Sequence, residues 1–245
     1  MRFEGKSAIV SGAAGDVGRL LCRALAHEGA HVVGIDIAAT SGEELERDLR
    51  GVGLNFSFRM VDVADPSAIT AFCDTVDSVD ILVNNAGILG YWPLSETSLA
   101  DWDRVLSINL RSAFLMTKGV RPKLTEGSTI LNMSSSVALR ASANTAAYSA
   151  SKAGLIAFSK VAAVELAPRT RVNAICPGPL DTAMPRRFLQ GHPHAEEIMR
   201  SMGEATMLKR LGEAQEVVQL CLFLASAESG FITGAAMTID GGMSA

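Results

Sequence analysis

Short blocks of β-branched and other apolar residues alternate along the chain with longer segments whose apolar positions recur every three or four residues. Such blocks are typical of strands buried on both faces, and the longer period is typical of helices. The blocks predict strands at Ser7–Ser11, His31–Ile35, Phe56–Val61, Asp80–Asn84, Ser128–Met133, Arg171–Cys176 and Met237–Asp240. The longer segments predict helices at Val17–His27, Gly42–Arg50, Pro66–Val76, Ser98–Lys118, Tyr148–Ala167 and Glu213–Ala225.

This alternation predicts the fold class. Strands that alternate with helices form a parallel sheet, with right-handed crossovers that place helices on both of its faces. We therefore expect an α/β, doubly wound, Rossmann-type sheet of about seven strands, folded as one domain over residues 1–245. In such folds the ligand crevice lies at the carboxyl ends of the strands.

The alternation is interrupted over residues 183–210, where no strand is predicted and prolines, arginines, histidines and methionines gather. Long insertions in a compact domain are usually lids or binding loops. We interpret this stretch as a substrate-binding lid; a surface excursion without function is the alternative.

Composition narrows the function classes. The net charge is −4 and no basic block occurs, which argues against a nucleic-acid or anionic membrane partner. No apolar run approaches the roughly 20 residues of a membrane span, and the first residues lack the apolar core of a signal peptide. We expect a cytoplasmic protein. The four cysteines lie far apart and are interpreted as small buried side chains, and no spacing predicts a metal site.

A glycine-rich turn joins the first strand to the first helix: Ser11-Gly12-Ala13-Ala14-Gly15-Asp16-Val17-Gly18. Glycines allow a tight turn and close approach to a pyrophosphate, and the helix N-terminus offers N–H groups to it. The position of the turn after a strand and before a helix indicates a dinucleotide site.

Asp36 ends the second predicted strand, about 20 residues after the glycines. A carboxylate there accepts hydrogen bonds from the ribose hydroxyls of NAD and repels the 2′-phosphate of NADP. Neither Ala14 nor Ile37 supplies a compensating cation. The sequence therefore predicts NAD as the cofactor.

Tyr148 and Lys152 lie four residues apart in a predicted helix, and so on one helix face. A phenol is a poor base at neutral pH, and a nearby cation lowers its pKa toward the range that proton transfer requires. The helix follows a strand that ends in Ser134-Ser135-Ser136. Together these residues indicate acid–base chemistry on an alcohol or ketone.

With these motifs the chain resembles a classical short-chain dehydrogenase/reductase over essentially its whole length. The matching pieces are the Gly12–Gly18 turn, Asp62-Val63, Asn84-Asn85-Ala86-Gly87, Asn109, Ser135, Tyr148 with Lys152, Asn173, Pro177-Gly178 and Asp240-Gly241-Gly242. The resemblance implies that Tyr148 is the general acid/base. It also implies that Lys152 lowers the pKa of Tyr148 and holds the nicotinamide ribose, that Ser135 holds the substrate oxygen, and that Asn109 anchors a water next to Lys152.

The same resemblance implies most of the cofactor contacts. Asp62 and Val63 would lie at the adenine, and Asn85, Ala86 and Gly87 would run along the cofactor. The loop with Pro177, Gly178, Leu180 and Thr182 would hold the carboxamide and the diphosphate. Gly12, Gly15, Asp16, Val17, Gly18, Asp36, Tyr148 and Lys152 complete the expected cofactor site.

Two departures from the family pattern stand out. In the first motif, Ser11 replaces a threonine and Asp16 replaces the middle glycine. Because a carboxylate would repel the diphosphate, we expect Asp16 to point outward and cap the following helix. The connection Pro168–Arg171 is also short, which we interpret as a tightened loop without chemical consequence.

The helix after Lys152 is apolar around nearly its whole circumference. Such a helix needs burial beyond one sheet face. We expect a homo-oligomer, a tetramer or dimer, assembled through this helix; a fully internal helix is the alternative.

The predicted function is hydride transfer between NAD(H) and a small secondary alcohol or ketone. Two alternatives are a relative of the nucleotide-sugar epimerases and dehydratases, which the chain length disfavours, and an NAD-binding regulator without turnover. The expected pocket walls are Leu89–Leu94, Val137–Thr145 and the 183–210 lid. Their arginines either bind a substrate carboxylate or face water.

Overall fold

Seven parallel strands form one sheet in the order β3-β2-β1-β4-β5-β6-β7. The computed structural model describes all of residues 1–245. The strands are β1 (Ser7–Ser11), β2 (His31–Asp36), β3 (Phe56–Met60), β4 (Val79–Asn84), β5 (Leu124–Met133), β6 (Thr170–Pro177) and β7 (Ala236–Ile239). The predicted strands are all present.

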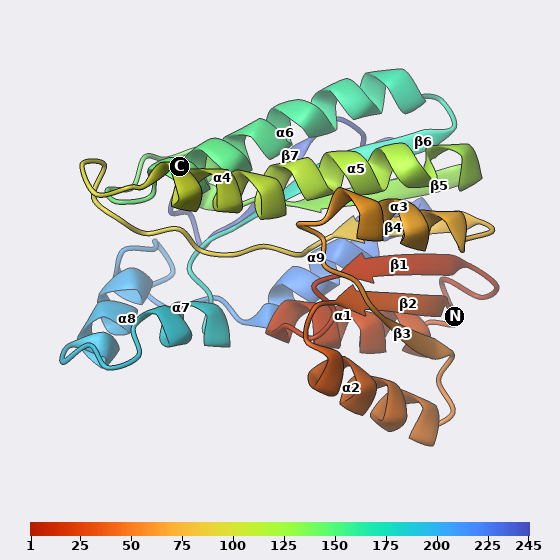
Figure 1. Ribbon diagram of the computed structural model, residues 1–245, viewed down its shortest axis with the longest axis horizontal. Helices are drawn as coiled ribbons and strands as arrows, with labels where there is room; N and C mark the ends of the chain where they lie inside the picture. Colours follow the sequence, from red (N-terminus) through yellow and green to blue (C-terminus); the bar gives the residue numbers. More distant parts are fainter.

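Helices cover both faces of the sheet (Figure 1). One face carries α1 (Asp16–His27), α2 (Ala39–Gly51) and α9 (Ala214–Ala225), and the other carries α3 (Pro66–Asp74), α4 (Leu99–Leu106), α5 (Ser112–Val120) and α6 (Ala146–Leu166). The predicted fold class, an α/β doubly wound sheet, is confirmed. No helix combines the length and hydrophobicity that a membrane crossing requires.

Strand residues alternate between two cores, one under each helical layer. In β1, Ala8 and Val10 join the core beneath α1 and α9, whereas Ile9 joins the core beneath α3 and α5. This alternation is the period-two pattern of a strand buried on both sides. It explains why the strands appear as continuous apolar blocks in the sequence.

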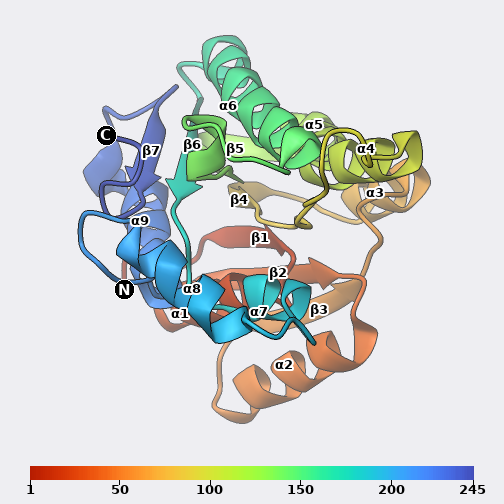
Figure 2. The same ribbon diagram turned by 90° about the vertical axis from the view of Figure 1, so that its left-hand side faces the viewer.

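The strand order reverses between β1 and β4, which are neighbours in the sheet. A reversal opens a crevice at the carboxyl ends, because the helices leave toward opposite faces. The 183–210 segment lies at this end and forms α7 (Ala183–Phe188) and α8 (Ala195–Glu204) (Figure 2). The segment has no named strand, as predicted, and its two helices were not predicted. Its role as a lid stays a prediction, and the word lid is used below for residues 183–210.

Two elements differ from their predicted form. β5 begins at Leu124, four residues before the predicted Ser128, and Leu124 pairs with Val79 of β4. The predicted helix Ser98–Lys118 runs from Leu99 to Val120, but its middle, Ser107–Arg111, is π-helical. One-turn π segments interrupt the α-helical register and are frequent at functional sites.

Candidate active site

The turns that follow β1 and β4 are bonded together. The Ser11 hydroxyl oxygen accepts from the backbone N–H of Asn85 at 3.0 Å and of Ala86 at 3.1 Å. Gly12 has φ +68°, and a Cβ at this position would lie 2.9 Å from the Ala86 Cα. Ser11, which replaces the threonine of the family pattern, therefore joins the two turns through its hydroxyl group.

The start of α1 is suited to a phosphate. A Cβ on Gly18 would collide with the carbonyl oxygen of Gly12, so only glycine lets the helix begin this close to the turn. The backbone N–H groups of Asp16, Val17 and Gly18 have no hydrogen-bond acceptor. Three free donors at a helix N-terminus form an anion site, so the residues present fit a dinucleotide diphosphate.

The expected cap at Asp16 is wrong. The N-cap of α1 is Gly15, and no side chain caps the helix. The Asp16 Oδ2 atom instead accepts from the backbone N–H of Ala183, the first residue of α7. Asp16 belongs to the first turn of α1, so its carboxylate is too far along the helix to act as the cap.

The expected adenosine residues end neighbouring strands. The Asp36 carboxylate accepts from the N–H of Ala14 and of Ala38, each at 3.0 Å, and so fixes the glycine turn against the end of β2. Asp62, which follows β3, is exposed and accepts from Ala64 N–H at 2.8 Å. Val63, the next residue, packs against the apolar core.

The loop after β6 is held from two sides. A Cβ on Gly178 would lie 2.7 Å from the Cα of Asp240, so the loop passes tightly over the end of β7. Leu180 forms a β-bridge with Gly212, which returns from the lid. The buried Asp240 carboxylate accepts from Ser244 and Gly242. Thr182 directly precedes α7, and its side chain makes no cap bond.

Tyr148 and Lys152 lie together near the start of α6. The Lys152 Nζ atom is 5.7 Å from the centroid of the Tyr148 ring. Lys152 is 3% exposed and donates to the carbonyl oxygen of Met133 at 2.7 Å. One helix therefore brings the phenol and the ammonium to the same point at the carboxyl end of β5.

The pKa values differ from the expected pattern. Burial raises the pKa of the Tyr148 phenol, and the influence that lowers it is a hydrogen bond with the Ser135 hydroxyl, not Lys152. Burial also lowers the pKa of the Lys152 ammonium from 10.5 to about 8. The ammonium donates to Met133, and that Lys152 lowers the phenol pKa stays a prediction.

The structure separates the adjacent serines. Ser134 is buried, and its hydroxyl donates to the Lys152 carbonyl oxygen at 2.8 Å, so it anchors α6 to β5. Ser135 is half-buried, its hydroxyl oxygen accepts from the Val137 N–H at 3.4 Å, and its hydroxyl acts to lower the pKa of the Tyr148 phenol. Of the two, Ser135 is the serine that stands beside the phenol.

Asn109 lies in the π-helical segment and is 1% exposed. Its Nδ2 donates to the Ile88 carbonyl at 3.0 Å, and its Oδ1 accepts from Ile88 N–H at 2.8 Å. A Cβ on Gly87 would lie 3.3 Å from both Asn109 Oδ1 and Lys152 Nζ. Glycine at 87 therefore keeps open the space between the amide and the ammonium.

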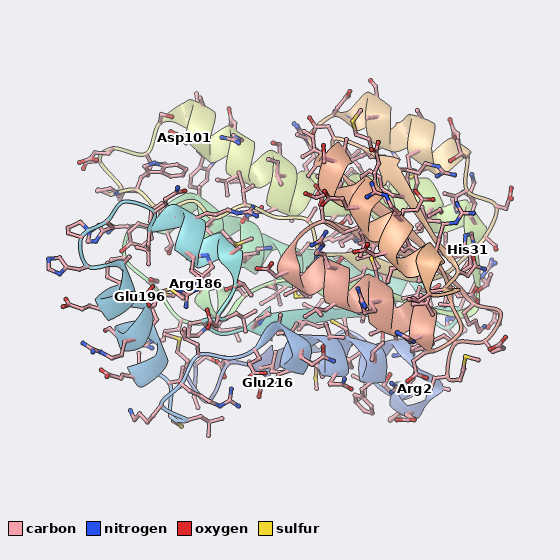
Figure 3. The ribbon with its side chains drawn as sticks, turned by 90° about the horizontal axis from the view of Figure 1, so that it is seen from below. Arg2, His31, Asp101, Arg186, Glu196 and Glu216 are labelled. Atoms are coloured by element: carbon pink, nitrogen blue, oxygen red, sulfur yellow. The ribbon has the colours of Figure 1, made fainter.

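Further contacts involve the 183–210 segment. The Tyr91 and Phe188 rings meet edge to face at 5.2 Å, joining the loop after β4 to α7. Arg186 bonds to Asp181 at 2.8 Å and to Glu196 at 3.0 Å, on the lid (Figure 3). The contact of Tyr91 with Phe188 could not be predicted from the sequence, because the two residues are far apart in the chain and no sequence motif connects them.

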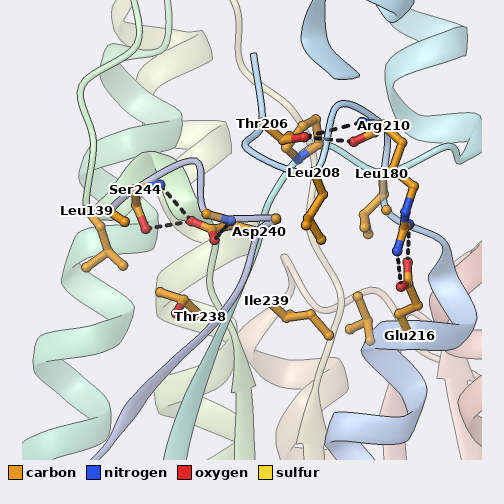
Figure 4. Close-up of a pocket in the computed structure, with 16 residues that line it drawn as sticks. Leu139, Leu180, Thr206, Leu208, Arg210, Glu216, Thr238, Ile239, Asp240 and Ser244 are labelled. Carbon is orange, nitrogen blue, oxygen red and sulfur yellow. Dashed lines mark hydrogen bonds and ion pairs between the residues drawn. The ribbon is translucent and has the colours of Figure 1, made fainter. Parts of the chain in front are cut away.

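A cavity of about 640 Å³ lies beside the site, at the ends of β6 and β7 (Figure 4). Leu139, Leu180 and Leu208 contribute apolar side chains to its wall. Arg210 forms an ion pair with Glu216 at 2.6 Å, and the Asp240 carboxylate accepts from the neutral Ser244 hydroxyl.

Comparison with known proteins identifies the family. A family model described as "Enoyl-(Acyl carrier protein) reductase" matches residues 12–244. Dehydrogenase/reductase SDR family member 6 of Xenopus laevis is 34% identical over 247 residues, 99% of each chain. A cyclopentanol dehydrogenase of a Comamonas species is 37% identical over 251 residues, covering 100% of this chain and 99% of that enzyme.

Solved structures agree. A short-chain dehydrogenase/reductase from Serratia marcescens has a TM-score of 0.92 and 32% identity, with 100% of both chains covered. A blue fluorescent protein from a metagenomic library, solved in complex with NADPH, has a TM-score of 0.92 and 30% identity, again with 100% of both chains covered. The chain belongs to the short-chain dehydrogenase/reductase family of oxidoreductases, as its motifs predict.

Replacing Lys152 by methionine tests the burial of its charge. With its pKa lowered from 10.5 to about 8, a protonated Lys152 costs up to about 3 kcal/mol of folding free energy at neutral pH. We expect Lys152→Met to raise the urea midpoint of unfolding at pH 7. The gain from removing the buried charge is reduced by the loss of the hydrogen bond to Met133. Between about pH 8 and pH 10.5 the Lys152 side chain is protonated in the unfolded chain but neutral in the folded protein. The free energy of unfolding of the wild type therefore rises with pH in this range, and the stability advantage of the variant becomes smaller.

The matched control is Lys160→Met, on the exposed side of the same helix, which should leave the midpoint nearly unchanged. A destabilised Lys152→Met protein at pH 7, or an advantage that does not vary with pH, would contradict this account.

Proposed function

We propose that the protein transfers hydride between NAD(H) and an uncharged secondary alcohol or ketone. One observation carries the proposal: a phenol, an ammonium and a serine hydroxyl meet at the strand ends where α1 presents three free N–H groups. A phosphate-binding helix beside an acid–base pair is what hydride exchange with a pyridine nucleotide needs.

Each residue has a role in proton transfer. The nicotinamide supplies or accepts the hydride when it is bound. Tyr148 donates a proton to the ketone oxygen in reduction and takes one from the hydroxyl in oxidation, and Ser135 stabilises charge on that oxygen. A raised phenol pKa keeps Tyr148 protonated at neutral pH, which favours reduction there. Lys152 has a pKa of about 8 and can therefore exchange a proton near neutral pH. Its partner would be the water expected beside Asn109, in the space that Gly87 leaves open.

NAD is the cofactor that Asp36 favours. Its carboxylate ends β2 and takes part in none of the ion pairs of the structure, so it remains able to accept from ribose hydroxyls. One observation favours NADP as the second candidate. Arg19 lies against the Ser41 carbonyl at 3.3 Å, near the start of α2, and its Nε atom has no partner.

An uncharged substrate is favoured by the pairing of the arginines. Arg186 is held by two carboxylates, Arg210 by Glu216, and Arg140 by the Met243 carbonyl at 3.4 Å. Arg200 also lies 3.8 Å from Glu204. A substrate carboxylate would have to break one of these contacts, except at Arg187, which forms no ion pair. The relative named cyclopentanol dehydrogenase is consistent with a small, neutral alcohol.

Assembly through α6 remains our proposal for the oligomer. Val164 is 80% exposed and Val161 55% exposed on this helix, so it is not fully internal. A groove lined by Leu106, Leu110 and Phe158, among others, lies between α4, α5 and α6. A second copy of the chain would cover this apolar surface.

Replacing Tyr148 by phenylalanine tests the acid–base role. We expect kcat to fall by about a hundredfold to ten-thousandfold in an NADH absorbance assay over cyclic alcohols and hydroxy acids, with NADH binding retained. Tyr91→Phe, at the only other tyrosine of the chain, keeps its ring against Phe188 and is the matched control. Equal rates in both variants would refute the role, and a preference for hydroxy acids would refute the uncharged substrate. Nucleotide binding without turnover of any substrate would favour a regulator.

Asp36→Asn tests cofactor choice, because the amide keeps an acceptor oxygen for the turn but loses the charge. We expect the wild type to bind NADH at least about tenfold more tightly than NADPH, and the variant to lose most of that ratio, measured by fluorescence titration. Tighter binding of NADPH by the wild type would instead support the Arg19 alternative.

Val164→Glu tests assembly. Charge on an interface face opposes association, so light scattering after gel filtration should show a smaller species than the wild type. Val52→Glu, at a residue 65% exposed after α2, is the control and should leave the mass unchanged. A wild type that is already monomeric, or an unchanged Val164→Glu assembly, would overturn the proposed interface.

A further inference from the structure

The Asp16 carboxylate connects two segments that are 167 residues apart in the chain. It starts from the first turn of α1 and accepts from the N–H of Ala183 in the lid. Because the first N–H groups of a helix lack partners within the helix, Ala183 is a donor that needs an outside acceptor. Asp16 supplies it.

This bond is the only hydrogen bond between α1 and the lid. The other contacts of α7 lead elsewhere: Phe188 packs on Tyr91 of the loop after β4, and Arg186 bonds within the lid region itself. The N-terminal end of α7 is thus positioned over the glycine turn by Asp16.

The same carboxylate adds a negative charge where α1 offers its free N–H groups. Asp16 is exposed, so the effect on a nearby phosphate is that of two charges in water. At about 4 Å this repulsion amounts to a factor of about five in a dissociation constant. A glycine, which the family pattern has at this position, would add no charge and no bond to the lid.

We propose that Asp16 is a positioning residue with two separable effects: its oxygen tethers the lid to the cofactor turn, and its charge weakens cofactor binding. The second effect rests on the proposed function, whereas the first does not. The residue therefore holds the lid in a fixed position and at the same time lowers the affinity for a dinucleotide.

Two variants separate the effects. Asp16→Asn removes the charge and keeps an oxygen that can accept from Ala183. Asp16→Gly removes both the charge and the acceptor. Asp16 is an exposed residue, so both variants should fold, which a thermal unfolding curve verifies.

The charge is measured by NADH fluorescence titration. We expect Asp16→Asn to bind NADH about fivefold more tightly than the wild type, with the gain largely lost in about 0.5 M NaCl because salt screens exposed charges. Glu196→Gln, which removes an acidic charge from the lid away from the turn, is the control and should bind like the wild type. Equal or weaker binding by Asp16→Asn, or an equal gain in Glu196→Gln, overturns the proposed effect of the charge.

The tether is measured without cofactor, by limited trypsin digestion. Cleavage after Arg186 and Arg187 of α7, relative to cleavage after Arg47 of α2, should rise severalfold in Asp16→Gly and stay at the wild-type level in Asp16→Asn. No rise in Asp16→Gly, or the same rise in both variants, overturns the tether. If the wild type binds no pyridine nucleotide, the proposed function and the charge effect fall together, while this digestion still decides the tether.

Discussion

The close contact between the turns after β1 and β4 is the constraint on which the site depends. Parallel strands that are neighbours in the sheet end at the same edge, and here the Ser11 hydroxyl and the bare Cα of Gly12 let Asn85 and Ala86 approach. On one side of this contact α1 begins with free N–H groups. On the other, the chain continues to Gly87, beside Lys152 and Asn109. The proposed phosphate-binding and proton-transfer ends of the site are therefore positioned by a few adjacent residues.

Burial is the second determinant of the chemistry. Lys152 is held almost entirely out of water, and its ammonium is compensated by one carbonyl oxygen. This lowers its pKa to about 8 and costs folding free energy, because a charge in a poorly solvated place is unfavourable. The same burial makes the Tyr148 phenol hold its proton more tightly. Both groups therefore have pKa values that differ from their values in water: the pKa of the phenol is higher and that of the ammonium is lower.

Much of the fold could be predicted from the sequence, because burial on both faces makes each strand a continuous apolar block. β1 has the predicted bounds, and most other strands differ by a residue or so. β5 began earlier than predicted, since Thr125, Glu126 and Gly127 are not apolar and only pairing near Val79 makes this stretch part of a strand. The π-helical turn at Asn109 also has no local signal, because it depends on packing against the loop at Ile88.

The candidate site residues could be predicted from their motifs, but the contacts that they make in the folded protein could not. The spacing of Tyr148 and Lys152 predicts a shared helix face, and this is where they lie. That Lys152 points to Met133, and that Asp16 reaches Ala183, depends on residues distant in the chain, for which one sequence carries no pattern. Electrostatic effects act through distances and solvent exposure, and so they could be assigned only from the folded protein.

The direct test of the central claim is a spectroscopic titration of the Tyr148 phenol. Tyr91→Phe leaves Tyr148 as the only tyrosine, so the absorbance of phenolate reports on this residue alone. The account predicts a pKa above the usual value of a tyrosine in the protein alone, and a lower pKa with saturating NAD⁺, since a cation beside the ring stabilises the phenolate. An ordinary pKa that NAD⁺ does not change would show that this phenol is not the group that exchanges protons.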